Sequence, residues 1–444
     1  MKRCLLAILA LLLGMHGFSQ GINFEHGTWK EVLEKARQSN KPIFVDVYTS
    51  WCGPCKKMST EIFPLEKVGK IFNQGFICYK VDAEKGEGPE LKIRYNVAAF
   101  PTFLFVRPDG TLFYSKVGSC DTGSFISLAK NATKEFVNNR SAVLDQEYLS
   151  KKNDLGFVYG YLKNRDKAGI ALQPYLDEYL KALPAEQRIS SKNKQFYESI
   201  SNTIKATDFA YQCLAESYLT AASKMGKVLT QACLERGIYA SHREAVTNKD
   251  EKLLQQVVDI RNTIGWELYA VSASELYMGY YKQVEAYDKY VQYAIPFADS
   301  ILLAATDSFF AQKDLEHEKL LTKINKDRLK QEQELLKSQG TTFTKQAVAN
   351  ALNRIANTIM LNISNTPHLQ RALVFAQKAE SLAPKDARIK STQANLLYKM
   401  GNTKEAISKA QEALNVVAEA DKEAQTAISS DMDKMKNGEK TWKN

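Results

Sequence analysis

The sequence predicts an α/β amino-terminal domain followed by an all-α domain of helical repeats. Three observations lead to this fold class. Over residues 21–138, short β-prone runs alternate with helical periods, which is typical of a layered α/β fold. From residue 139 onward, amphipathic helical periods are interrupted only by turn signals. Near the carboxyl end, small residues recur at the 34-residue spacing of paired helices.

Length and composition agree with a folded chain of more than one domain. The 444 residues exceed one typical core, and contents of 44% hydrophobic and 25% charged residues exclude the collagen-like and disordered classes. The net charge of +10 comes from Lys and Arg residues that are scattered among acids. We therefore expect a solvated basic surface and no nucleic-acid partner.

Residues 1–20 have the layout of a secretory signal peptide. Lys2-Arg3 is followed by an apolar run from Cys4 to Leu13 and then by small and polar residues. An uncleaved membrane anchor is the alternative, but spanning a bilayer takes roughly 20 apolar residues, which is longer than this run. We expect cleavage, a mature start near Gln20 or Gly21, and a periplasmic or otherwise extracytoplasmic location.

The first helix and the central strand of the α/β domain each have a clear signal. Thr28-Trp29-Lys30-Glu31 is a capping box, which predicts a helix that begins there and runs to about Ser39. Next, the run from Ile43 to Tyr48 is β-prone throughout and includes one acid, Asp46, as expected of a strand covered on both faces. That strand leads directly to two cysteines.

The remaining elements complete the domain. A helix should begin at the cysteines and continue through Thr60, and a strand should follow over residues 76–81. Two further strands, 103–106 and 111–117, flank the turn Arg107-Pro108-Asp109-Gly110 and form a hairpin. A last helix is expected over residues 122–138.

Cys52 and Cys55 are the candidate reactive residues. A zinc site would need four ligands, and the five histidines of the chain are isolated from one another. A CxxC pair that follows a central strand and begins a helix favours redox chemistry instead. The unpaired amides of a helix N-terminus stabilise a thiolate at Cys52, which can attack a disulfide, and Cys55 lies one turn further to resolve the product. Pro54 is tolerated in a first turn, and Gly53 permits close approach of a substrate backbone.

At these residues the sequence resembles the thioredoxin family. The run from Phe44 to Met58, which contains Trp51-Cys52-Gly53-Pro54-Cys55, and the later run Val97-Ala98-Ala99-Phe100-Pro101-Thr102 carry the resemblance. The likeness is greatest to exported domains that end bacterial transmembrane thiol reductases. It implies that Cys52 attacks, Cys55 resolves and Trp51 packs beside them. It also implies that buried Asp46 exchanges the Cys55 proton, and that no cofactor is needed.

The resemblance further implies that Pro101 is a cis proline facing the CxxC, and that the Phe100 backbone pairs with an extended substrate segment. Phe100 departs from the smaller or β-branched residue common there. Gly118 matches the family's glycine in the last strand, whereas the family's lysine near the buried acid has no match, because Lys80 is out of step in the alignment.

Cys213 and Cys233 are predicted to form a structural disulfide. They are symmetric about Ser223 and close to the turn signal Met225-Gly226, so two antiparallel helices could bring them opposite one another.

The carboxyl-terminal region resembles tetratricopeptide-type repeats over residues 366–420. Ala372 and Ala379 match Ala406 and Ala413 at a spacing of 34, and Gly401 stands where two helices would turn. Because three repeats are normally needed for a stable stack, the irregular helices of residues 139–365 should supply the missing neighbours. Residues 421–444 are expected to form a terminal helix or tail.

These predictions favour an exported thiol:disulfide oxidoreductase of reductase or isomerase type. Its partners would be disulfide-bearing protein substrates, an electron-donating membrane thiol reductase, and an unidentified protein bound by the helical domain. The alternative is a non-catalytic interaction protein in which the α/β fold serves for docking. An isomerase of a eukaryotic secretory pathway ranks last, since the final residues carry no retrieval signal.

Overall fold

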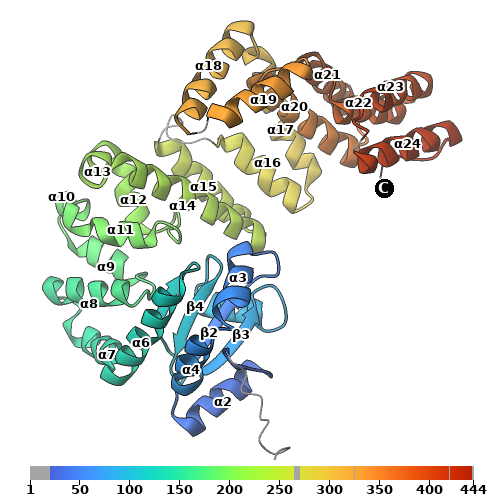
Figure 1. The fold of residues 1–444 in the computed structure, drawn as a ribbon. Helices are drawn as coiled ribbons and strands as arrows, with labels where there is room; N and C mark the ends of the chain where they lie inside the picture. Colours follow the sequence, from blue (N-terminus) through green and yellow to red (C-terminus); the bar gives the residue numbers. More distant parts are fainter. Residues whose placement is uncertain (1–20, 265–270, 325, 420, 443–444) are drawn as a thin grey trace, which may run out of the picture. The chain divides into compact units, whose positions relative to one another are not determined.

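A computed structural model describes residues 21–264, 271–324, 326–419 and 421–442 of the chain. The chain divides into two compact units, Met1–Ala240 and Ser241–Asn444 (Figure 1). The predicted signal peptide, residues 1–20, lies outside the described residues.

The first unit contains a five-stranded sheet in the order β1-β3-β2-β4-β5. Its strands are β1 (Phe24–Glu25), β2 (Ile43–Tyr48), β3 (Ile77–Asp82), β4 (Thr102–Val106) and β5 (Leu112–Val117). Strand β3 pairs in parallel with β1 and β2, whereas β4 pairs antiparallel with β2 and β5. The predicted central strand and hairpin are therefore confirmed.

The helices of the α/β domain are α2 (Trp29–Ser39), α3 (Gly53–Lys57), the π-helical turn η1 (Met58–Ile62), α4 (Glu66–Gly75), α5 (Gly88–Arg94) and α6 (Thr122–Asn138). Helices α2 and α6 begin and end close to where the sequence signals place them, whereas the bounds of α4 and α5 were not predicted. The capping box at Thr28 is formed in full, and α2 ends at Asn40, which adopts a left-handed conformation with φ 49°. The helix predicted at the cysteines changes to π-helical geometry at Met58.

Both faces of the sheet are covered by apolar side chains, and phenylalanines dominate one of them. Phe125 of α6 is fully buried and stacks on Phe72 of α4 at a centroid distance of 4.5 Å. It also meets Phe103 of β4 at 5.1 Å and Phe44 of β2 at 5.8 Å. This packing fixes β2, and with it the chain segment that follows β2.

The rest of the first unit is helical and returns to the edge of the sheet. Its helices are α7 (Arg140–Lys151), α8 (Leu155–Lys167), α9 (Tyr175–Ala182), α10 (Ala185–Arg188), α11 (Lys194–Ile200), α12 (Phe209–Glu216) and α13 (Tyr218–Met225), and α14 (Lys227–Asn248) continues into the second unit. After α8, the Ala168 carbonyl accepts a hydrogen bond from the Ser115 amide at 2.8 Å. The Ser115 hydroxyl donates to the Gly169 carbonyl at 2.5 Å. The loop thus occupies part of the outer edge of β5.

The disulfide predicted between Cys213 and Cys233 is absent, and both residues are free and buried. The prediction assumed a hairpin of two helices, but α13 forms a separate helix between α12, which carries Cys213, and α14, which carries Cys233. The Cys233 thiol instead donates to the carbonyl of Tyr197 at 3.7 Å.

In the described residues of the second unit, helices are the only regular secondary structure. Its helices are α15 (Glu251–Ile264), α16 (Ala273–Gln283), α17 (Tyr287–Ala304), α18 (Asp307–Ile324), α19 (Lys326–Ser338), α20 (Phe343–Asn362), α21 (Thr366–Leu382), α22 (Ala387–Lys399), α23 (Thr403–Val416) and α24 (Lys422–Asn437). No single helix among the described residues is long and apolar enough to cross a membrane, and only α17 with the start of α18 meets that test as a pair, bent by 90°.

Helix pairs stack in this unit as the repeat pattern predicted. Helix α20 packs on α21, and α22 packs on α23. The matched alanines, Ala372, Ala379, Ala406 and Ala413, are all fully buried, and Gly401 makes its turn with φ 91°. The missing neighbours come from the α16 and α17 pair, since α17 packs on α20 and α21, and from α24, which packs on α23.

Candidate redox site

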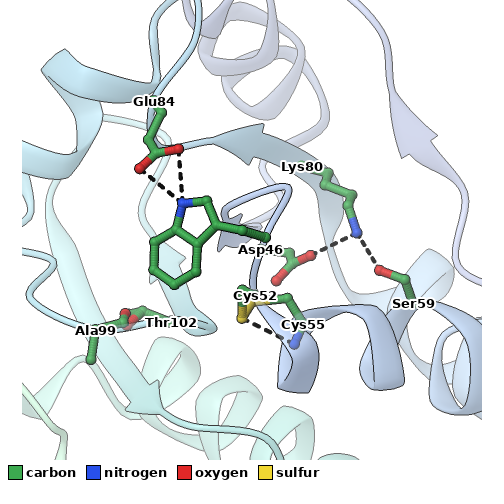
Figure 2. Close-up of a disulfide and its surroundings, with 9 residues drawn as sticks. Asp46, Cys52, Cys55, Ser59, Lys80, Glu84, Ala99 and Thr102 are labelled. Atoms are coloured by element: carbon green, nitrogen blue, oxygen red, sulfur yellow. Dashed lines mark hydrogen bonds and ion pairs between the residues drawn. A yellow bond between two sulfur atoms is a disulfide. The ribbon is translucent and has the colours of Figure 1, made fainter. Parts of the chain in front are cut away.

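Cys52 and Cys55 form a disulfide at the point where β2 passes into α3 (Figure 2). Cys52 is the N-cap of α3 and has extended backbone geometry, whereas Cys55 lies within the helix. The Cα atoms are 5.3 Å apart, and the Cys55 amide donates a hydrogen bond to the Cys52 sulfur at 3.1 Å. An amide that points at a sulfur stabilises negative charge there, so the first turn favours the thiolate at Cys52.

The disulfide is recessed beside an exposed aromatic side chain. Cys52 is 4% exposed and Cys55 is 2% exposed, whereas Trp51 is 65% exposed. The Trp51 ring meets Phe100 edge to face at a centroid distance of 6.1 Å. Gly53 has no atom within 4 Å of where a Cβ would stand, which leaves room for another backbone to approach.

The loop before β4 brings the predicted proline into the same site. The Phe100–Pro101 peptide bond is cis, as the resemblance implied. The Pro101 carbonyl accepts a hydrogen bond from the Gly118 amide at 2.8 Å, and the Thr102 hydroxyl donates to the Ala99 carbonyl at 2.7 Å. These bonds tie the loop to the end of β5 and to its own turn.

Asp46 is 1% exposed, and its carboxyl points toward the cysteine pair in Figure 2. It forms an ion pair with Lys80, whose ammonium lies 3.0 Å from Oδ2. Burial raises the pKa of Asp46, and the positive charge of Lys80 offsets part of that rise. Among the residues that the structure describes, Oδ1 has no hydrogen-bond donor. A buried carboxyl with a raised pKa beside a cysteine pair is a candidate proton-exchange group.

Lys80 corrects the sequence alignment, which left it out of step. In the parallel pair of β2 and β3, Asp46 is directly opposite Lys80. Directly paired residues project to the same face of a sheet, so their side chains meet. The predicted strand began at Phe76, one residue before the observed start at Ile77, and counting from Phe76 would have placed Tyr79 opposite Asp46.

Comparison with known proteins places this site in a family. Residues 22–152 match the family Thioredox_DsbH, described as a protein of unknown function, DUF255. The thioredoxin of Borreliella burgdorferi is 33% identical over 103 residues, which are 23% of this chain and 83% of that protein. The chain belongs to the thioredoxin family. Thioredoxin Y2 of Arabidopsis thaliana is 31% identical over 105 residues, 24% of this chain and 59% of that protein.

Solved structures of thioredoxin type are also similar to the amino-terminal part of the chain. A putative disulphide-isomerase from Bacteroides thetaiotaomicron is 40% identical and is covered to 93%, over 25% of this chain, with a TM-score of 0.24. A DsbH oxidoreductase is 24% identical and is covered to 92%, over 28% of this chain, also with a TM-score of 0.24. The helices beyond residue 152 lie outside the family match.

Two further residues of the thioredoxin-like site were not predicted. Glu84 accepts hydrogen bonds from the Trp51 indole nitrogen at 3.0 Å to each carboxylate oxygen, and so fixes the ring (Figure 2). Ser59 of η1 accepts a hydrogen bond from the Lys80 ammonium at 2.5 Å. Both residues come from segments outside the two runs that carry the resemblance, so only the folded arrangement identifies them.

Proposed function

We propose that this protein is a thiol:disulfide oxidoreductase of reductase or isomerase type that acts on disulfides in other proteins. The observation that carries the proposal is the Cys52–Cys55 disulfide at the start of α3, next to the cis bond at Pro101 and above buried Asp46. Each of these features serves a step of thiol–disulfide exchange, and together they go beyond what a docking module needs.

The reaction begins with the reduced pair. The Cys52 thiolate attacks one sulfur of a substrate disulfide, which forms a mixed disulfide and releases the other substrate sulfur as a thiolate. Cys55 then attacks the Cys52 sulfur, so that the substrate leaves as a dithiol and Cys52–Cys55 is oxidised. Two electrons pass to the substrate. They must be restored by an external dithiol donor before the next cycle.

Asp46 supports the second half of this reaction. Cys55 is buried, so its proton needs an acceptor within the protein before it can attack. A carboxylate whose pKa is raised by burial takes that proton more readily than an exposed one. The positive charge of Lys80 lowers the pKa of Asp46 from the level that burial alone would set, which favours the ionised form that acts as the base.

The exposed surface around the disulfide fits an extended polypeptide. Trp51 and Phe100 form an aromatic wall on one side, while Gly53 and Pro54 leave the other side open. A segment that runs past Phe100 can pair with its backbone and present its disulfide to Cys52. The Phe100 ring is larger than the residue common at this position in the family, so it leaves less room beside Cys52. It should therefore favour substrate segments with small residues next to the substrate cysteine.

For the cellular setting we propose export to the periplasm, reduction by a membrane thiol reductase, and a protein partner for the helical repeats. Gly21 is built into the domain, because its carbonyl accepts a hydrogen bond from Asn73 at 3.0 Å. A mature start at Gln20 or Gly21 would keep this hydrogen bond. An extracytoplasmic site needs electrons from across the membrane, which a membrane dithiol donor supplies.

Insulin reduction by dithiothreitol tests the activity with the full chain. Cys52→Ser should abolish the catalysed rate, whereas Cys120→Ser, at a half-buried thiol packed against the phenylalanine cluster, should retain it. Full activity in Cys52→Ser would overturn the proposal and favour the non-catalytic docking function. Cys55→Ser should instead accumulate mixed disulfides at Cys52, and mass spectrometry of the trapped proteins would identify the substrates and the donor.

A further inference from the structure

Ser59 occupies an unusual position in the helix that carries the cysteines. The helix changes to π geometry after Lys57, and the Phe63 amide bonds the Met58 carbonyl at 2.9 Å, five residues back. On this turn Ser59 is partly buried, and its hydroxyl oxygen accepts a hydrogen bond from Lys80. Helix geometry thus brings a hydroxyl of η1 to an ammonium of β3 (Figure 2).

The two residues of this contact line an open cavity of about 640 Å³. Ser59 and Lys80 both line it, together with Gly21, Ile22, Phe24, Phe63 and Pro64. The Lys80 side chain is 24% exposed, so its long flexible stem has open space to move into. The side chains of the other lining residues are apolar, so they offer the Lys80 ammonium no hydrogen bond.

Two polar contacts hold the Lys80 ammonium. One is Asp46 at 3.0 Å, and the other is Ser59 at 2.5 Å. The ring of Tyr48 lies 4.5 Å away and that of Phe63 5.2 Å away, and both offer a face to the cation. The titratable groups facing Lys80 are Asp46 and Tyr48, and Asp82 of β3 acts on Tyr48.

We propose that Ser59 is a positioning residue that holds the Lys80 ammonium on Asp46 and thereby sets the pH range in which the dithiol reacts. The inference rests on the proposed function. Without the hydroxyl, Lys80 turns into the cavity and hydrates, and Asp46 loses the positive charge that favours its ionised form. Asp46 then requires a higher pH to act as the base for Cys55.

The pH profile of insulin reduction by the full chain tests this role. Ser59→Ala should move the acid limb to higher pH by about 0.5, a fraction of the effect of an adjacent cation on a carboxyl. Ser59→Thr keeps a hydroxyl, so the acid limb of its pH profile should lie at the wild-type pH. Thr60→Ala is the matched control, because the exposed Thr60 hydroxyl donates only to the Lys56 carbonyl of its own helix, at 3.0 Å.

A double-mutant cycle links the shift to Asp46. In an Asp46→Asn background, assayed at higher enzyme concentration, Ser59→Ala should produce no further movement of the limb. An unchanged limb in Ser59→Ala, or a movement that persists in Asp46→Asn, overturns the inference. Lys80→Met gives a second check, since it should move the limb in the same direction and further. If Cys52→Ser is active, the proposed function itself fails, which is a different result.

Discussion

The contact between the helical region and the sheet can be broken at one residue, Gly169. This glycine has φ 67°, and a Cβ at this position would collide with the Ser115 carbonyl oxygen. We predict that Gly169→Val releases the loop from β5. Valine is β-branched and poorly suited to positive φ, so the loop cannot keep its conformation next to the strand.

The size of the effect follows from the bonds that are lost. A left-handed conformation costs a side-chain-bearing residue about 1 to 2 kcal/mol. The two hydrogen bonds that join Ser115 to Ala168 and Gly169 contribute roughly 1 kcal/mol each. The free energy of local opening should therefore fall by about 3 kcal/mol, which corresponds to about 100-fold faster hydrogen exchange.

Hydrogen exchange followed by mass spectrometry measures this directly on peptides from β5. The Ser115 amide should exchange faster in Gly169→Val, while the β2 amides keep their protection because the phenylalanine core is untouched. Gly160→Val is the matched control, since Gly160 lies in α8 with nothing within 4 Å of its Cβ position. Equal exchange of β5 in wild type and Gly169→Val would refute the reasoning.

Three further predictions concern the core, the buried acid and the free thiols. Phe125→Ala should destabilise the first unit by about 3 to 5 kcal/mol and lower its urea midpoint, and an unchanged midpoint would contradict the packing described for this ring. Asp46 holds its proton to higher pH in the folded chain than in the unfolded chain, so wild-type stability should fall as pH rises from about 4 through the raised pKa. Asp46→Asn should lack that slope in urea denaturation at a series of pH values. Burial raises the pKa of Cys213 and of Cys233 to about 11, so both should resist thiol reagents in the native state and appear as free thiols in non-reducing peptide mapping.

Features fixed by short stretches of sequence were predictable. The capping box at Thr28 set the start of α2, and the unbroken β-prone run before the cysteines set the central strand. The redox pair, Asp46 and the cis bond at Pro101 came from two local runs. The helix start, the central strand and the CxxC pair are set by residues that are neighbours in the chain, so local pattern was enough for them. The role of Asp46 and the cis bond at Pro101 were implied by the family resemblance of those runs.

Features that depend on packing between distant segments were not predictable in the same way. The Lys80 pairing depends on the register of two strands, and the Ser59 contact depends on a π-helical turn that no pattern announced. The disulfide prediction for Cys213 and Cys233 failed for a related reason, because it assumed a hairpin where the chain forms an additional helix. One misplaced turn changes which side chains face each other along the whole of the next helix.

The edges of the sheet explain one role of the helices that follow the thioredoxin-like domain. An uncovered edge strand exposes unpaired amides and carbonyls that can recruit other strands. At one edge β1 is only two residues long, which limits such pairing. At the other edge, the loop after α8 takes up the Ser115 amide. Pairing of another strand is thereby discouraged at Ser115 of β5. Under the proposed function this restriction matters, because a polypeptide that paired away from the dithiol would be held where it cannot react.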